Sequence, residues 1–375
     1  MKKYIILFLI LFNIVNAFSA DYSKIDKKSG TVPSNLNSAA EIALYLTQNL
    51  NSKTDKTRAI YYWISHNIRY DLSMLNSKKD YANTKEIIDE VLQRRQGVCQ
   101  NYAELFHACC ESVGIRSFVI YGYTDQKGEM ANYGHAWNAV LIDGKYYEID
   151  ATWAAGHLEY GKYKMQFDDQ YFMIAPADFI RSHIPFDPIW QFSENPITHK
   201  EFEKGDFSKL KIPSNFNYND SIKVLSGLTQ LEKAIRENRR IIQFGMTNAL
   251  IRKQVAFNQQ LIVTTKFNMA VNLFNKGVAD YNSYMLYKNK QFQGTKMKDE
   301  QILDFLASAR HQVESAESLL SFLNSDKADL NRMMRDMQSS INKMKKDLLK
   351  EDAFMEKYIN TLKPFRIFLF VTTRQ

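Results

Sequence analysis

The chain has 375 residues, which is enough for two domains or for one large domain with a sizeable core. Its hydrophobic content of 45% and aromatic content of 13% argue against overall disorder, because such a chain can bury enough apolar surface to fold. The formal net charge is +8, but no dense cluster of basic residues supports nucleic-acid binding, so the charge fits a mildly basic surface.

Residues 1–20 are typical of a secretory signal peptide. Lysines occupy positions 2 and 3, residues 4–15 are almost all apolar, and small residues follow. The apolar run is short for a membrane span, and no later apolar segment is long enough to be one. We expect cleavage between Ala17 and Ala20, and therefore a secreted or periplasmic protein with no transmembrane segment after cleavage.

Helical spacing of apolar residues predicts helices over three ranges: 39–48, 54–67 and 84–94. Gly97 breaks this pattern, which resumes from Cys99 to Val113. Gly114 is well placed as the C-cap glycine of that helix.

Strands are predicted after this helix at 117–123, 135–142 and 145–152. Asp143-Gly144, between the last two, is a strong signal for a two-residue hairpin turn. Helices followed by an antiparallel sheet define an α+β fold, which we assign to residues 21–215.

The composition shifts toward Asn, Ser and Pro near residues 211–220, which indicates a linker. Helical signals dominate from Ser221 to about Asn360, with an interruption near Gly294, and predict two to four long helices packed as a hairpin or small bundle. We assign residues 221–375 to a helical C-terminal domain. This tail either packs against the core or binds a partner protein, and the sequence favours neither.

The three cysteines are Cys99, Cys109 and Cys110, and an odd count leaves at least one thiol unpaired. Cys99 and Cys109 are separated by about 15 Å of helix rise, which is beyond the span of a disulfide. The neighbours Cys109 and Cys110 are also poorly placed to pair, so we expect no structural disulfide.

Cys99 begins its predicted helix, where free backbone N–H groups and the helix dipole favour the thiolate that a cysteine nucleophile requires. Gly97 before it allows a tight turn and close approach of a substrate backbone. The backbone N–H of Cys99 can help to bind an oxyanion.

The hairpin turn brings His135 and Asp150 together. A two-residue turn pairs residues whose numbers sum to 287, so His135 faces Thr152 and Trp137 faces Asp150. His135 and Asp150 are then diagonal neighbours on one face, with Cβ atoms roughly 7–8 Å apart, near enough for a hydrogen bond. A one-residue bulge would move Asp150 to the other face, but the sequence carries no bulge signal there.

Cys99, His135 and Asp150 form the candidate catalytic triad. His135 takes the thiol proton, or holds it in an ion pair with the thiolate, and later donates it to the leaving group. Asp150 orients the imidazole and stabilises its charged form. Trp137 and Trp153 are expected to wall the site.

Other histidines are weaker candidates for the base. His107 lies eight residues further along the same helix, about 12 Å from Cys99. His157 and His183 remain alternatives, but no acid is positioned for either of them.

The motifs around these residues resemble the transglutaminase-like superfamily, whose core has a cysteine at a helix start and a histidine and an aspartate on the following strands. The resemblance covers about residues 40–200 and rests on these segments: Trp63-Ile64, Asn67-Ile68-Arg69-Tyr70-Asp71, Gly97 to Ala103, Gly114-Ile115, Gly122-Tyr123, His135 to Val140, and Asp143-Gly144 with Asp150 to Trp153. The chain looks most like the branch that includes the kyphoscoliosis peptidase and fungal cytokinesis proteins of the Cyk3 type. That part of the resemblance rests on Tyr171-Phe172-Met173 with Pro176, His183-Ile184-Pro185 and Trp190-Gln191.

The resemblance implies a papain-like α+β core with Cys99, His135 and Asp150 as the triad. It does not fix the reaction, because members of the superfamily hydrolyse peptides, cross-link glutamine to amines or act as inert scaffolds. It offers no basis for calcium activation, and we expect no metal or other cofactor. The candidates for the second oxyanion donor are Gln96, Gln100 and Trp63.

We therefore expect an exported cysteine-dependent enzyme that hydrolyses peptide or amide bonds of a protein or peptide substrate through a thioester. Hydrolysis is favoured over cross-linking because water needs no dedicated amine site. The alternatives are a protein-glutamine transglutaminase and a catalytically inert scaffold that binds a partner through the helical tail. We expect no nucleic-acid partner.

Overall fold

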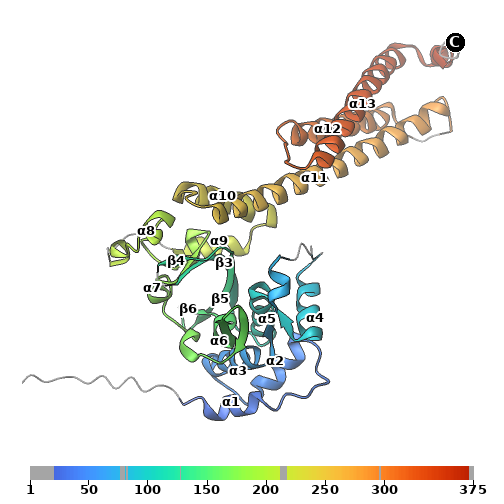
Figure 1. Cartoon of the computed structure of the whole chain (residues 1–375). Coiled ribbons are helices and arrows are strands. Elements are labelled where there is room, and N and C mark those ends of the chain that lie inside the picture. Colours follow the sequence, from blue (N-terminus) through green and yellow to red (C-terminus); the bar gives the residue numbers. More distant parts are fainter. Residues whose placement is uncertain are drawn as a thin grey trace, which may run out of the picture. The chain divides into compact units, whose positions relative to one another are not determined.

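The computed structural model describes residues 21–76, 81, 83–126, 128–211, 218–294 and 297–370. The predicted signal peptide, residues 1–20, lies outside these ranges. The chain forms two compact units, one ending at Tyr218 and the other beginning at Asn219 (Figure 1). Each unit has a hydrophobic core of its own.

The α-helices of the N-terminal unit are α1 (Ser23–Ser29), α2 (Ala39–Thr47), α3 (Lys53–Asn67), α4 (Thr84–Arg94), α5 (Cys99–Ser112), α6 (Ala151–Ala155), α7 (Pro176–Phe179) and α8 (His199–Glu203). Its strands are β1 (Arg69–Tyr70), β2 (Gln96–Gly97), β3 (Ser117–Gln126), β4 (Glu129–Met130), β5 (His135–Ile142), β6 (Lys145–Ile149), β7 (Gly156–Glu159), β8 (Lys162–Met165) and β9 (His183–Pro185). Helices first and an antiparallel sheet afterwards confirm the predicted α+β order.

Local sequence signals explain where the first helices begin. Ser38 and Glu41 form a capping box at the start of α2, and the Ser52 side chain accepts from the Asp55 N–H at the start of α3. The predicted helix at 84–94 matches α4, and Gly114 takes up the left-handed conformation (φ +74°) that ends α5.

Helix α5 is the central helix of this unit. It packs against α2, α3 and α4 on one side and against β3 and β5 on the other (Figure 1). Its apolar residues, among them Leu105, Phe106 and Cys109, are fully buried. The start of α5 is therefore held at the edge of a packed core, beside the sheet.

The sheet runs in the order β4-β3-β5-β6, and β9 also pairs with β3. The β5–β6 hairpin has the predicted register, from Ile142 opposite Lys145 to Asn138 opposite Ile149. Asp143 and Gly144 both have positive φ, as the predicted two-residue turn requires.

The predicted strand at 145–152 is wrong in its last three residues. Strand β6 ends at Ile149, and Asp150 is the N-cap of α6, with its side chain accepting from the Thr152 and Trp153 N–H groups. Aspartate is among the preferred N-cap residues, so the short helix begins where the sheet pattern was expected to continue.

The C-terminal unit is helical, which confirms the predicted helical C-terminal region. Its α-helices are α9 (Tyr218–Ser226), α10 (Gln230–Phe244), α11 (Ala249–Asn289), α12 (Asp299–Leu320) and α13 (Ala328–Asn360). Gly277 lets α11 and α12 approach closely, because a Cβ there would lie 2.9 Å from a Val313 methyl group and 3.0 Å from the Ala309 carbonyl oxygen. Within the described ranges, no helix has both the length and the apolarity needed to cross a membrane.

Candidate active site

Cys99 is the first residue of α5 and is half-buried. The turn before it is closed by Asn101, whose side-chain oxygen accepts a 2.9 Å hydrogen bond from the Val98 N–H. The same side chain fills the space where a Cβ of Gly97 would lie, only 2.6 Å from the Asn101 Cβ. Gly97 is therefore required by the close approach of Asn101.

A second contact fixes the segment that leads into Cys99. Strands β1 and β2 pair in parallel, with Tyr70 opposite Gly97, and the Asp71 N–H donates to the Gly97 carbonyl oxygen at 3.0 Å. Asp71 is in turn held by Arg94 at the end of α4, at 2.6 Å. These contacts tie the segment before α5 to strand β1 and, through Asp71, to the end of α4.

The structure brings His135 and Asp150 into direct contact. Nε2 of His135 lies 2.7 Å from Oδ2 of Asp150, and their side chains are 10% and 0% exposed. The other carboxylate oxygen, Oδ1, accepts from the backbone N–H groups of Thr152 and Trp153 at 2.8 and 3.0 Å. Asp150 is thus a buried anion with a fixed orientation.

The three candidate residues interact electrostatically. Burial lowers the pKa of His135, but the Asp150 carboxylate and a hydrogen bond with the Cys99 side chain outweigh it and raise this pKa to about 10. Burial also raises the pKa of Asp150, but the two histidines beside it hold that pKa well below its usual range. Because Nε2 of His135 is taken by Asp150, Nδ1 is the nitrogen left for Cys99.

His183 contacts the same carboxylate, so the expectation that no acid is positioned for it is wrong. Its Nε2 lies 3.2 Å from Oδ2 of Asp150, and its side chain is fully buried. The residue reaches the site because β9 pairs with β3, placing His183 opposite Thr124. Strands β3 and β9 are far apart in the sequence, and periodicity within each segment does not show that they pair. The sequence signal for the contact of His183 with Asp150 is therefore limited to the position of His183 in a short extended segment.

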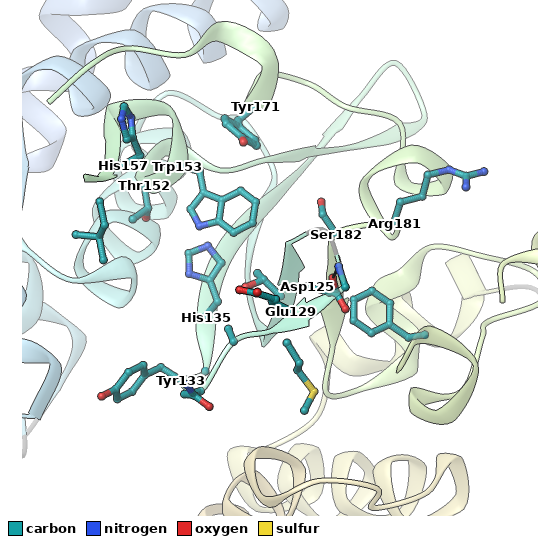
Figure 2. A pocket seen from close by; sticks show the side chains of 18 of the residues that line it. Asp125, Glu129, Tyr133, His135, Thr152, Trp153, His157, Tyr171, Arg181 and Ser182 are labelled. Atoms are coloured by element: carbon teal, nitrogen blue, oxygen red, sulfur yellow. Dashed lines mark hydrogen bonds between the residues drawn. The ribbon is translucent and has the colours of Figure 1, made fainter. Parts of the chain in front are cut away.

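Aromatic side chains surround the histidine pair, as expected of Trp137 and Trp153. The Trp153 ring lies 5.7 Å from that of His135, and Figure 2 shows both rings at the cleft. The Trp137 ring is buried, and its Nε1–H donates to Glu148 at 3.0 Å. Burial raises the pKa of Glu148 well above its usual value.

A cleft of about 1190 Å³ opens beside the site. His135, Tyr70 and Trp153 contribute to its lining, whereas Cys99 is not among the lining residues. Asp125 and Glu129 also line the cleft (Figure 2). The cleft is large enough for several residues of a peptide, and His135 is the member of the candidate triad that faces it.

The three oxyanion candidates differ in their surroundings. Trp63 is 2% exposed and belongs to the hydrophobic core, with the Arg95 guanidinium 5.1 Å from its ring centroid. The Gln100 amide lies 3.5 Å from the Tyr121 hydroxyl, at the limit of a hydrogen bond. Gln96 is exposed on β2.

All three cysteines are free thiols. Cys109 and Cys110 are buried in α5, and burial raises the pKa of both, to about 12 for Cys109. Cys99 is therefore the thiol that a reagent or substrate can reach.

His135, Asp150 and His183 also form, within the described ranges, the one cluster of metal-ligand types whose donor atoms lie within 4.8 Å of one another. The two imidazole Nε2 atoms lie 2.7 and 3.2 Å from Oδ2 of Asp150, which are hydrogen-bond distances. In each contact the imidazole is the donor and the carboxylate is the acceptor. Hydrogen bonding alone accounts for this cluster.

The site thus combines a half-buried cysteine at a helix start with a histidine on the adjoining strand β5 and an aspartate at the N-cap of α6, within an α+β domain. Residues 40–151 match the family model of the transglutaminase-like superfamily, so the chain contains a transglutaminase-like domain.

The chain is similar to the mouse (Mus musculus) kyphoscoliosis peptidase, with 30% identity over 198 residues that cover 50% of this chain and 29% of the peptidase. It is also 26% identical over 186 residues to cytokinesis protein 3 of Schizosaccharomyces pombe, covering 47% of this chain and 20% of that protein. These relatives support the predicted branch of the superfamily. The match spans less than a third of each of these two relatives.

Among solved structures, one described as that of a TGase is 19% identical, covers 43% of this chain and 38% of the other, and has a TM-score of 0.25.

Proposed function

We propose that this protein is a cysteine-dependent acyl-transfer enzyme that hydrolyses peptide or amide bonds through a thioester, with Cys99, His135 and Asp150 as its triad. The observation that carries the proposal is the imidazole of His135, bonded to Asp150 through Nε2 and interacting with Cys99. The superfamily match of residues 40–151 supports the coarse enzyme class.

In the first half of the proposed reaction, His135 holds the Cys99 proton at Nδ1, so that the pair starts as a thiolate and an imidazolium, and Asp150 stabilises the imidazolium. The thiolate attacks the carbonyl carbon of the substrate and forms a carbon–sulfur bond. The backbone N–H of Cys99, at the start of α5, contributes to binding the oxyanion. His135 then protonates the leaving nitrogen as the carbon–nitrogen bond breaks.

In the second half, water loses a proton to His135 as it attacks the thioester. The carbon–oxygen bond forms, the carbon–sulfur bond breaks, and the acid product leaves with the thiol restored. Transfer to an amine would follow the same steps with the amine in place of water. We favour water because hydrolysis needs no dedicated binding site for an amine.

The substrate class that fits the cleft is an extended peptide or protein segment. A volume of about 1190 Å³ exceeds that of most small-ligand pockets, and its walls combine aromatic and charged side chains. We further propose that the enzyme works after export, on the strength of the signal-like residues 1–20.

The test of the enzyme proposal combines a fluorescent thiol-reactive probe with a peptide library, in the presence and absence of a labelled primary amine. Wild-type protein is expected to be labelled at Cys99 and to hydrolyse a subset of peptides, and Cys99→Ala to do neither. Cys110→Ala, which changes a buried thiol of the same helix, serves as the matched control and is expected to keep labelling and turnover.

Amine incorporation faster than hydrolysis would show a transglutaminase instead. Full cellular function of Cys99→Ala, combined with loss of function on removal of residues 221–375, would show a scaffold that acts through the helical tail.

Export is tested by mass spectrometry of the protein purified from its native source. A mature N-terminus between residues 18 and 21, in the extracellular or periplasmic fraction, is expected. Intact protein beginning at Met1 inside the cell would contradict this part of the proposal.

A further inference from the structure

His183 has no part in the mechanism above, yet it contacts the central carboxylate of the site. Its Nε2 lies 3.2 Å from Oδ2 of Asp150, the same oxygen that His135 contacts at 2.7 Å. Both Asp150 and His183 have side chains that are 0% exposed. A buried carboxylate oxygen is thus shared by two imidazoles.

The neighbours of His183 determine which of its nitrogens carries the proton. Asp150 is ionised and can only accept, so Nε2 of His183 is the donor to it. Nδ1 is then an acceptor, and the Ser182 hydroxyl lies 2.8 Å from it, closer than the 3.4 Å between the same hydroxyl and the Phe179 carbonyl oxygen. Ser182 therefore donates to Nδ1 and stabilises this tautomer.

Aromatic rings enclose the His183 imidazole. The Phe179 ring is stacked on it at 4.0 Å between centroids, and the rings of Trp153 and Trp137 lie at 4.3 and 5.3 Å. Burial lowers the pKa of His183 to about 4, a stronger effect than the opposing pull of Asp150. At neutral pH this imidazole is uncharged, in contrast to that of His135.

Burial raises the pKa of the other acidic groups packed around the pair. Burial raises the pKa of Tyr171 to about 12, and raises the pKa values of Tyr61 and Tyr70 further still. Burial also raises the pKa of Glu148, which is bonded to Trp137, well above its usual value. Within the site, the charge on Asp150 is therefore balanced by the His135 imidazolium, while the neutral His183 contributes a hydrogen bond.

We propose that His183 is a positioning residue that shares the Asp150 carboxylate with His135 and limits how strongly that carboxylate holds the imidazolium proton. An oxygen that accepts a second hydrogen bond has less negative charge to offer the first donor. His183 thereby keeps the carboxylate in place and leaves His135 acidic enough to protonate a leaving group. This inference rests on the proposed acyl-transfer role of Cys99 and His135.

Two variants at one position separate the hydrogen bond from the packing. His183→Phe keeps an aromatic ring among its aromatic neighbours but removes the donor, whereas His183→Gln keeps an N–H that can reach Asp150. The readout is the rate of Cys99 carboxymethylation by iodoacetate as a function of pH. Iodoacetate is an anion that the imidazolium attracts, so the rate of carboxymethylation falls as His135 loses its proton at high pH. The midpoint of this fall is called the upper pH limit of the reaction below.

Without the His183 hydrogen bond, Asp150 holds the His135 proton more tightly. In His183→Phe the upper pH limit of the reaction is therefore expected to move upward by about 0.5–1 pH unit, and in His183→Gln it is expected to stay close to wild type. An upper limit that is unchanged or lowered in folded His183→Phe would overturn the proposal.

His199→Phe is the matched control. His199 is a second buried histidine whose pKa is lowered to about 4, but it contacts the Phe186 carbonyl oxygen and the Tyr123 hydroxyl. The His199→Phe variant is expected to have the same upper pH limit as wild type. If its upper pH limit moves upward as far as that of His183→Phe, the shift is a general effect of losing a buried histidine.

A measurement on the wild-type protein covers the case in which the variants do not fold. In protein with ¹⁵N-labelled histidines, His183 is expected to be the neutral Nε2–H tautomer at pH 7, with its proton protected from exchange. An Nδ1–H tautomer or an imidazolium at this residue would overturn the proposal.

Both readouts are independent of turnover. The protein could hydrolyse no peptide and still show the expected shift of the iodoacetate profile in His183→Phe. That result would overturn the peptidase proposal and support the proposed role of His183.

Discussion

Asp150 is the residue on which most interactions of the candidate site converge. Its two oxygens accept from two backbone N–H groups and contact two imidazoles, all within 3.2 Å. Because the group is fully buried, its charge acts on His135 with little screening by solvent. A single carboxylate thus sets the protonation of the proposed base.

Replacing Asp150 by Asn removes this charge while keeping the size of the side chain. The Asp150 carboxylate raises the pKa of His135, so its loss should lower that pKa and move the upper limit of iodoacetate reactivity to lower pH. Turnover should fall by roughly 10²–10⁴-fold. Asp168→Asn, which changes another cleft carboxylate that caps a short helix, is the control and should keep the wild-type profile.

Gly97→Ala tests the packing that positions the nucleophile. The new Cβ would lie 2.6 Å from the Asn101 Cβ, so the turn before Cys99 must shift. We expect a loss of about 1–3 kcal/mol in the free energy of unfolding, measured by urea denaturation, together with slower labelling of Cys99. Gly30→Ala, where the added Cβ meets its nearest atom at 3.5 Å, should change neither quantity; equal losses in both variants would contradict the steric explanation.

At the scale of secondary structure, Asn138 connects three elements. Its side-chain amide on β5 donates to the Ala103 carbonyl oxygen in α5 at 2.9 Å and to the Phe118 carbonyl oxygen in β3 at 3.2 Å. These bonds hold the helix that begins at Cys99 against the strand that begins at His135. The relative position of Cys99 and His135 therefore depends on the side chain of Asn138, which contacts neither residue directly in these hydrogen bonds.

Asn138→Ala should leave two buried carbonyl oxygens without this donor. We expect a loss of about 1–3 kcal/mol in the free energy of unfolding and a drop in Cys99 labelling rate in the protein that remains folded. Asn132→Ala, at an exposed position, is the comparison variant and should match wild type in both assays. Normal labelling in folded Asn138→Ala would show that the helix keeps its position by other contacts.

The hairpin was predictable because its register depends on residues that are close in sequence. Asp143-Gly144 specifies the turn, and the turn specifies which residues of β5 and β6 face each other. The end of β6 was missed although a signal existed, since Asp150 is followed by a short helix that it caps. At Asp150 the alternating pattern predicts a continued strand, whereas the residue type predicts a helix N-cap. The hydrogen bonds from the Thr152 and Trp153 N–H groups to the Asp150 side chain stabilise the N-cap.

At the scale of the whole molecule, the two hydrophobic cores are separate clusters. One is built from α2, α3, α5 and the sheet, with residues from Ala39 to Ala155, and the other from α11, α12 and α13, with residues from Val263 to Tyr358. Since each cluster is buried within its own unit, each unit has the means to fold by itself.

Residues 21–218 expressed alone should therefore fold cooperatively and keep a Cys99 that reacts with iodoacetate at the wild-type rate. The measurements are thermal unfolding followed by circular dichroism and the carboxymethylation rate. The fragment 219–375 is the companion, expected to be helical and unreactive. An unfolded or unreactive N-terminal fragment would show that the site depends on the helical unit.

The amino-acid sequence by itself determined the cysteine at a helix start and the register of the hairpin, and it predicted that His135 and Asp150 lie close together. The first two features depend on local signals: a glycine break, a turn dipeptide and a two-residue strand period. The contact between His135 and Asp150 is made beyond the last paired residues of the hairpin, with Asp150 at the start of α6. Only the tertiary structure decided that His183 shares Asp150, that Asn101 fills the space beside Gly97, and that Asn138 ties α5 to the sheet. Those contacts arise when distant segments pack together, and the free energy that selects them comes from burial of the whole core rather than from any one stretch of sequence.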